Sequence, residues 1–129
     1  MFLGLRVVMY PAPDVVASKA WWTSVLGVEP YFDESYYVGY HVGGFELALD
    51  PHADPVHGPV TYWGVPDADQ ALKRLVAAGA TVREGVQEVG GSIRAASVTD
   101  PTGSTVGVIE NPHFALPESP PQAGSGPGR

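Results

Sequence analysis

The chain carries the same pattern of predicted elements twice, and this internal repeat restricts its fold more than any other feature. Each copy reads as one strand, one helix and three short strands (βαβββ), at residues 1–50 and 59–114, with a connector at 51–58. One copy alone buries only one face of a small sheet under one helix. We therefore predict an α+β fold in which the two modules form one curved, mostly antiparallel eight-stranded sheet, with a concave cavity inside and helices outside.

In the first copy, an apolar run at residues 2–10 is typical of a buried strand. Asp14 is a good helix N-cap and Gly27 a good C-terminal stop, which predicts a helix between them. Its spacing suggests that Ala17, Ala20, Trp21 and Val25 face the core and that Trp22 lies at the helix edge or in a subunit contact. The three short strands are expected at 28–33, 36–42 and 45–50.

The second copy follows the same order. A strand is expected at 60–65, and Asp67 with Gln70 forms a capping box for a helix that Gly79 ends. Three strands are then predicted at 81–88, 93–99 and 105–110. These two copies make one domain over residues 1–114, and the Pro- and Gly-rich segment 115–129 is predicted to be a flexible tail.

Composition excludes several classes of function. Seven Lys and Arg stand against fourteen Asp and Glu, a net charge of −7, whereas nucleic-acid binding needs a basic surface. The absence of Cys excludes disulfides, cysteine-based metal centres and thiol nucleophiles. Because there is no apolar run of membrane-spanning length and no signal peptide, we expect a cytoplasmic protein that binds neither membrane nor nucleic acid.

Two segments carry a resemblance to a known family. They are the end of the first helix, Trp21–Val28 (WWTSVLGV), and the turn before the last strand, Asp100–Ser104 (DPTGS). With the tandem βαβββ order, they resemble the vicinal oxygen chelate superfamily, which includes glyoxalase I, bleomycin-resistance proteins, extradiol dioxygenases and methylmalonyl-CoA epimerase. The resemblance covers Phe2 to about Pro112. It implies the fold, but not one activity, because this scaffold hosts several chemistries and pure binders.

The resemblance also implies four inward strand positions at which the family's enzymes hold a divalent metal with His and Glu. Counted from the shared landmarks, these positions are Val7, Glu46, Val60 and Gly107. Three of them have no side-chain donor, and a single carboxylate would hold a divalent metal weakly. We therefore expect neither a metal nor a cofactor, as in the metal-free members that bind a drug or metabolite.

The turn Gly43-Gly44 gives the sharpest local prediction. A two-residue loop pairs His41 with Glu46 across the hairpin, and strand alternation places both side chains on the cavity side, together with Tyr37. One interpretation is an acid/base pair or a polar grip on a ligand. The alternative is an ordinary polar pair on an exposed sheet surface.

The predicted ligand cavity is apolar and aromatic with one carboxylate, which suits a planar or cationic organic molecule. Its candidate residues are the inward positions of the central strands: Val7, Met9, Tyr37, His41, Glu46, Val60, Tyr62 and Gly107.

Two functions are consistent with these residues. The first is a metal-independent homodimeric protein that binds and sequesters a drug or metabolite. The second is a lyase, isomerase or dioxygenase-type enzyme that uses His41 and Glu46 as an acid/base pair or in an unusual metal site.

Overall fold

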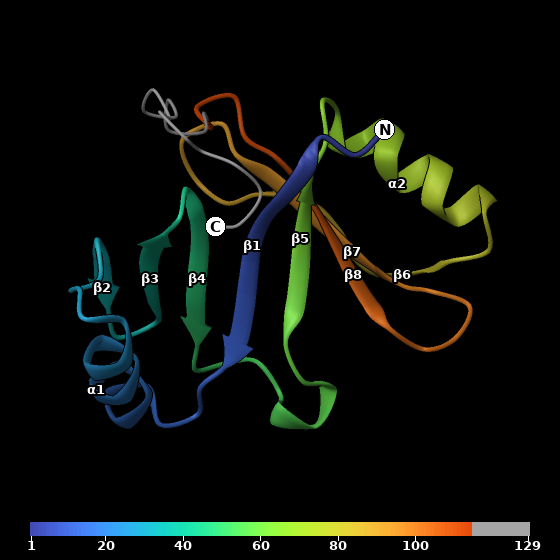
Figure 1. Ribbon diagram of the computed structural model, residues 1–129. Coiled ribbons are helices and arrows are strands. Elements are labelled where there is room, and N and C mark those ends of the chain that lie inside the picture. Colours follow the sequence, from blue (N-terminus) through green and yellow to red (C-terminus); the bar gives the residue numbers. More distant parts are fainter. Residues whose placement is uncertain (115–129) are drawn as a thin grey trace, which may run out of the picture.

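The protein forms one eight-stranded sheet in the order β2-β3-β4-β1-β5-β8-β7-β6 (Figure 1). The structure, a computed structural model, describes residues 1–114. The tail predicted at 115–129 lies outside the described residues. The strands of the first βαβββ module make one half of the sheet and those of the second module make the other half. The α+β fold predicted from the internal repeat is confirmed.

The first module contains β1 (Gly4–Pro11), α1 (Val15–Leu26), β2 (Phe32–Glu34), β3 (Tyr37–Val42) and β4 (Phe45–Asp50). The helix begins and ends where its caps predict: the side chain of Asp14 accepts a hydrogen bond from the Ala17 backbone N–H, and Gly27 is left-handed. In the turn between β3 and β4, Gly43 and Gly44 both have positive φ, as a two-residue hairpin of type I′ requires.

The second module contains β5 (Val60–Gly64), α2 (Ala68–Ala77), β6 (Thr81–Glu88), β7 (Arg94–Thr99) and β8 (Thr105–Glu110). The connector before it holds the short 3₁₀ helix η1 (Pro55–His57). The side chain of Asp67 caps α2 by accepting the Gln70 backbone N–H at 3.1 Å, as predicted. In residues 1–114, neither helix is long and apolar enough to cross a membrane.

Two neighbouring pairs of strands are parallel, β1 with β4 and β5 with β8, and every other neighbouring pair is antiparallel. Within each module, α1 or α2 lies in the connection that leads the chain from the central strand toward the outer strands. The antiparallel contact between β1 and β5 joins the two modules. The four strands at the centre of the sheet therefore come from distant parts of the sequence.

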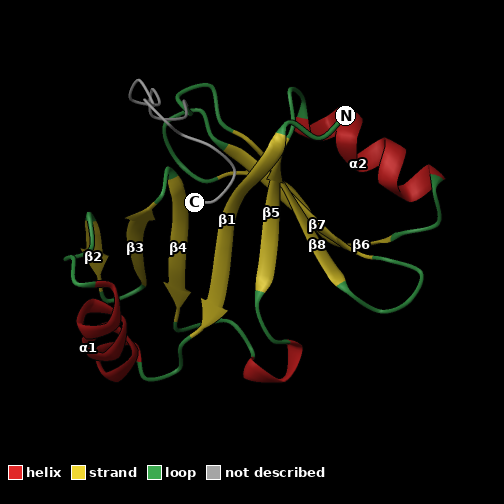
Figure 2. Ribbon diagram, viewed as in Figure 1, coloured by secondary structure: helices red, strands yellow, loops and turns green. Residues whose placement is uncertain are grey.

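Both helices pack on the same face of the sheet and leave the other face without helical cover (Figure 2). Under α1 the core contains Val38, Tyr40 and Leu49, and Tyr40 is fully buried with its hydroxyl 2.8 Å from Thr23 Oγ1. A separate core under α2 includes Ala71 and Val108. This arrangement follows strand alternation, which sends one set of side chains to the helices and the other set to the open face.

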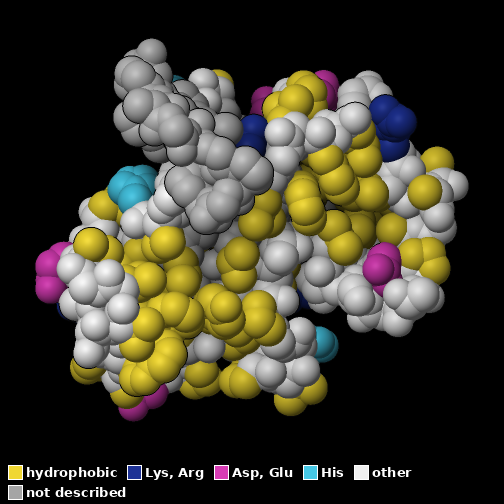
Figure 3. Space-filling model, viewed as in Figure 1, with side chains coloured by type: hydrophobic (Ala, Val, Ile, Leu, Met, Phe, Trp, Pro, Cys, Tyr) yellow, Lys and Arg dark blue, Asp and Glu magenta, His cyan; other side chains and the backbone are white. Residues whose placement is uncertain are grey.

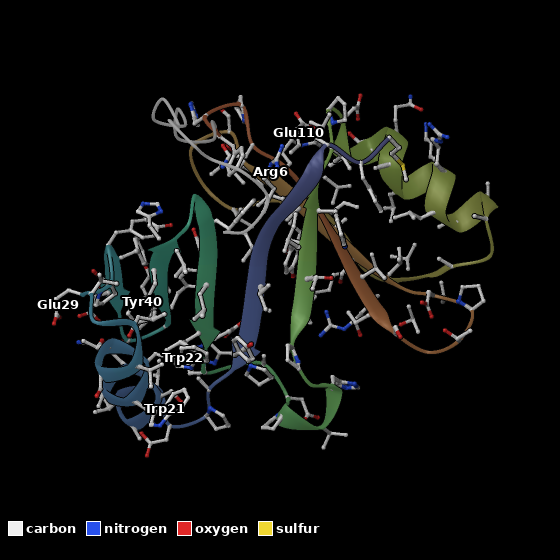
Figure 4. All side chains as sticks on the ribbon, in the orientation of Figure 1. Arg6, Trp21, Trp22, Glu29, Tyr40 and Glu110 are labelled. Carbon is white, nitrogen blue, oxygen red and sulfur yellow. The ribbon has the colours of Figure 1, made fainter. Side chains whose placement is uncertain are left out.

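The inward face of α1 differs from the predicted one. Trp22 packs into the core beside Tyr10, with ring centroids 5.2 Å apart, whereas Trp21 is 59% exposed. In Figure 4, Trp22 lies on the side of α1 toward the strands and Trp21 lies farther out. The prediction that Ala17, Ala20, Trp21 and Val25 face the core is wrong, since all four are exposed. Apolar side chains lie on several sides of α1, so periodicity alone cannot choose its inner face. Figure 3 shows apolar side chains gathered over α1.

Candidate functional site

One row of residues crosses the four central strands on the open face. Val7 on β1 pairs with Glu46 on β4 and with Tyr62 on β5, and Tyr62 pairs with Gly107 on β8. The row therefore contains Tyr62 and not Val60, which the landmarks had placed there. Val7 lies seven positions before the helix cap Asp14, but Tyr62 lies only five positions before Asp67, so a count transferred from the first module misses this position by two.

Glu46 is the one acidic side chain in this row, and its carboxylate accepts hydrogen bonds from two tyrosine hydroxyls. Tyr31 donates a hydrogen bond to Oε1, and Tyr37 donates one to Oε2. Gly39 makes room for this cluster, since a Cβ there would lie 3.1 Å from the Tyr31 ring and 3.2 Å from the Glu46 carboxylate. Glu46 is thus held in place by neutral donors.

The same contacts keep both tyrosines protonated. Burial, the negative charge of Glu46 and the hydrogen bond to it raise the pKa of Tyr37 far above its ordinary value. Partial burial, followed by the hydrogen bond and the charge of Glu46, also raises the pKa of Tyr31. Both hydroxyls therefore act as hydrogen-bond donors around neutral pH.

His41 lies directly across the hairpin from Glu46, as predicted from the two-residue turn. Its ring makes no hydrogen bond to that carboxylate among the described contacts, and the two partners of Glu46 are Tyr31 and Tyr37. Instead the imidazole stacks on the Tyr31 ring, with centroids 3.9 Å apart and an interplanar angle of 13°. The predicted register of His41 opposite Glu46 is therefore correct, but the His41 side chain contacts Tyr31.

Tyr62 covers the last position of the row. A Cβ at Gly107 would come within 2.8 Å of Tyr62 Cγ, so the ring packs directly against the glycine. Burial is the main cause that raises the pKa of the Tyr62 hydroxyl, and the charge of Glu84 adds to it. Because Gly107 has no side chain, it leaves room for the Tyr62 ring.

A cavity of about 860 Å³ opens over this face, a size typical of small-molecule sites. Six of the eight predicted residues line it: Val7, Met9, Tyr37, His41, Glu46 and Tyr62. The other two do not. Val60 lies opposite Met9 and is 3% exposed, and Gly107 lies beneath Tyr62. Most of the remaining lining is aromatic or aliphatic, including Tyr31, Phe45, Ile93 and Phe114.

Sequence reasoning missed Tyr31 and Arg6. Tyr31 precedes the short strand β2, and no periodicity links that position to β4. Arg6 is the extra residue of a β-bulge, because the register between β1 and β5 shifts between Leu5 and Val7. The bulge breaks the alternation from which the inward residues were chosen. A charged residue within an otherwise apolar strand was the signal available in the sequence.

The donor set does not fit the divalent metal that the family's enzymes hold. Of the four positions in the row, only Glu46 offers a carboxylate or imidazole ligand, and both of its oxygens accept tyrosine hydroxyls. Val7, Tyr62 and Gly107 supply no His or carboxylate. Within residues 1–114, no group of three or more His, Asp or Glu side chains is placed to hold a metal ion.

Many solved structures share this architecture, among them the three that follow. A Streptomyces coelicolor methylmalonyl-CoA epimerase in complex with 2-nitronate-propionyl-CoA is 14% identical, with TM-score 0.71 over 87% of this chain and 99% of that one. A glyoxalase/bleomycin resistance protein/dioxygenase superfamily member from Vibrio splendidus 12B01 is 20% identical, with TM-score 0.64 over 82% and 97%.

The third structure is the Mn(II)-bound glyoxalase from Novosphingobium aromaticivorans, 21% identical with TM-score 0.67 over 95% of this chain and 42% of that one. At these identities the likeness concerns the fold alone. None of the curated proteins matches the chain in sequence.

Fold and site together define a tandem βαβββ protein with a concave aromatic cavity that lacks its family's metal-ligand set. The model of the Glyoxalase/Bleomycin resistance protein/Dioxygenase superfamily matches residues 4–108. The chain belongs to this superfamily, as the resemblance implied. Its solved relatives include an epimerase and a glyoxalase, so membership leaves both an enzymatic and a binding role open.

Proposed function

We propose that the protein binds a small organic molecule with an aromatic part in its concave cavity, without a metal, and sequesters it. One observation carries this proposal: the only carboxylate among the described residues of the cavity lining, Glu46, is held by Tyr31 and Tyr37 in a space lined mostly by aromatic and apolar side chains. Such a surface favours ring stacking and apolar burial. Sequestration needs shape and surface complementarity, with no reacting group.

Binding of naphthalene probes of different charge tests this proposal. We expect one or more of naphthoate, naphthamide and naphthylmethylamine to bind, measured by calorimetry, and Tyr62→Ala to weaken that binding because it removes an aromatic wall. Val56→Ala is the control, since Val56 is exposed in η1 and lies outside the cavity. Binding should survive dialysis against EDTA. The proposal fails if no probe binds, if Tyr62→Ala has no effect or if EDTA abolishes binding.

An acid/base lyase or isomerase is the second candidate, because Glu46 and the Tyr31 and Tyr37 hydroxyls all line the cavity. The contacts favour binding over turnover, since His41 stacks on Tyr31 and both oxygens of Glu46 already accept tyrosine hydroxyls. Acetonaphthone in D₂O separates the two functions. Exchange of its methyl protons that Glu46→Gln abolishes would support the enzyme, and a probe recovered without exchange would support sequestration.

Two expectations from the sequence stay predictions. One is the cytoplasmic location. The other is a homodimer, for which the apolar side chains exposed on α1 offer a surface that a second copy could cover.

A further inference from the structure

Arg6 is the only arginine among the described strand residues that lines the cavity; Arg83 on β6 and Arg94 on β7 lie outside it. It lies on β1 near the end at which the chain enters the sheet (Figure 4) and lines the cavity. Because it is the extra residue of the β1 bulge, its side chain turns toward the open face beside Val7. Bulges commonly redirect one side chain in this way. The feature to explain is a half-buried guanidinium directed into an aromatic cavity.

The neighbouring backbone makes room for this side chain. A Cβ on Gly64 would lie only 2.8 Å from Arg6 Cζ, so the guanidinium occupies space that any other residue at Gly64 would fill. On the cavity side, Arg6 Cζ lies 3.9 Å from the centroid of the Phe114 ring. Glycine beneath and an aromatic ring above hold the planar group in a defined place.

No carboxylate neutralises Arg6 among the described residues. Three other cations are paired: Lys19 with Asp33, Arg83 with Glu84, and Arg94 with Asp69. Lys73 and Arg74 are exposed on α2, outside the cavity. The described contacts of Arg6 are a hydrogen bond to the Leu5 carbonyl oxygen and the Phe114 ring. Within residues 1–114, Arg6 therefore brings its charge to the cavity without a carboxylate beside it.

The charges of the cavity therefore differ from the charge of the whole chain. Glu46 is the one acidic side chain among the described lining residues, and its oxygens are occupied by tyrosine hydroxyls. Arg6 is the one Lys or Arg in the same lining. An arginine guanidinium presents several N–H donors in one plane, which suits the oxygens of a carboxylate or a phosphate.

We propose that Arg6 is the anchor for an anionic oxygen group on the ligand, whose aromatic or apolar part lies against the rest of the cavity. This inference rests on the proposed small-molecule binding and specifies its ligand class: an aromatic acid, in place of the cationic molecule that net charge favours. Carboxylate and phosphate share the recognition chemistry, and the experiment separates them.

Calorimetry with naphthoate, naphthyl phosphate, naphthamide and naphthylmethylamine tests the inference. We expect at least one of the two anions to bind about tenfold or more tightly than the amide, as a hydrogen-bonded pair with a charged group provides. The stronger anion identifies the oxygen group. Arg6→Gln should abolish the preference for the anion, whereas Arg74→Gln, which removes the same charge from the exposed face of α2, should keep it.

A second variant covers the case in which Arg6→Gln does not fold, as judged by circular dichroism. Gly64→Ala keeps the charge of Arg6 but pushes its guanidinium out of place, so it should also reduce the preference for the anion. Equal affinity for anion and amide, tightest binding of the amine, or an anion preference that survives in the folded variants would overturn the inference and leave small-molecule binding intact. Absence of binding by every probe would overturn both.

Discussion

Tyr37 donates a hydrogen bond to Glu46 Oε2, although the residue directly opposite Glu46 in the hairpin is His41. The tyrosine reaches the carboxylate across the glycine at position 39, which has no side chain to block it. Tyr31 completes the arrangement from the loop before β2. The two tyrosines thus donate hydrogen bonds to Glu46, which stands at a position where the family's enzymes hold a metal ligand.

Glu46→Gln should lower the pKa values of Tyr31 and Tyr37 toward their ordinary value, because the substitution removes the negative charge that helps to raise them. The measurement is the alkaline titration of tyrosine absorbance, with Tyr37→Phe identifying one of the transitions. Glu29→Gln, at an exposed carboxylate before β2, is the control and should leave the titration unchanged. A wild-type titration curve for Glu46→Gln would contradict this account of the cluster.

Stability should fall at alkaline pH. The pKa values of Tyr31, Tyr37 and Tyr62 are raised in the folded state, so the folded protein holds these protons more tightly than the unfolded chain. Their contribution to the free energy of unfolding is therefore complete below about pH 10, the ordinary tyrosine value, and is lost as pH rises above it. Urea unfolding at a series of pH values measures the slope, which should be shallower in Tyr37→Phe. A free energy that rises through this range would refute the prediction.

Gly107→Ala should destabilise the protein by about 1–3 kcal/mol, the usual cost of overpacking, because the new methyl group overlaps the Tyr62 ring. The cost should shrink in a Tyr62→Ala background, which denaturant unfolding of the double-mutant cycle measures. Gly85→Ala is the matched control on β6, where a Cβ would meet nothing within 4 Å. Equal costs in both backgrounds would show that Tyr62 is not the neighbour that matters.

Elemental analysis of the purified protein should find far less than one metal ion per chain, since one carboxylate in the central row is a poor ligand set. Stoichiometric Zn, Ni, Mn or Fe would contradict the metal-independent function. It would favour instead an enzyme with an unusual site that includes Glu46.

A homodimer should be visible by light scattering and should use the apolar side of α1. Val16, Trp21 and Val25 are 76%, 59% and 56% exposed there. Trp21→Glu should shift the protein toward a monomer because it places a charge in the contact. Val56→Glu, at an 87% exposed position in η1, is the control. A wild-type monomer would contradict the dimer, and an unchanged dimer in Trp21→Glu would move the contact elsewhere.

Local sequence signals were sufficient to predict both helices and the β3–β4 hairpin, whereas β2 lies at Phe32–Glu34 and not at the predicted 28–33. Asp14 and Gly27 bound α1, Asp67 caps α2, and the Gly43-Gly44 turn sets the register that pairs His41 with Glu46. Each of these features depends on residues only a few positions apart. Backbone caps and a two-residue turn act through short-range hydrogen bonds and φ preferences, which the sequence displays directly.

The composition of the site required the tertiary structure. Tyr62 takes the row position assigned to Val60, because the register between β1 and β5 depends on contacts between distant segments. Trp22 and not Trp21 enters the core, since an almost uniformly apolar helix is oriented by what it packs against. Arg6 enters the cavity because a bulge interrupts strand alternation. The sequence by itself determined the repeat, the helix limits and the hairpin, whereas long-range pairing decided which side chains share the cavity.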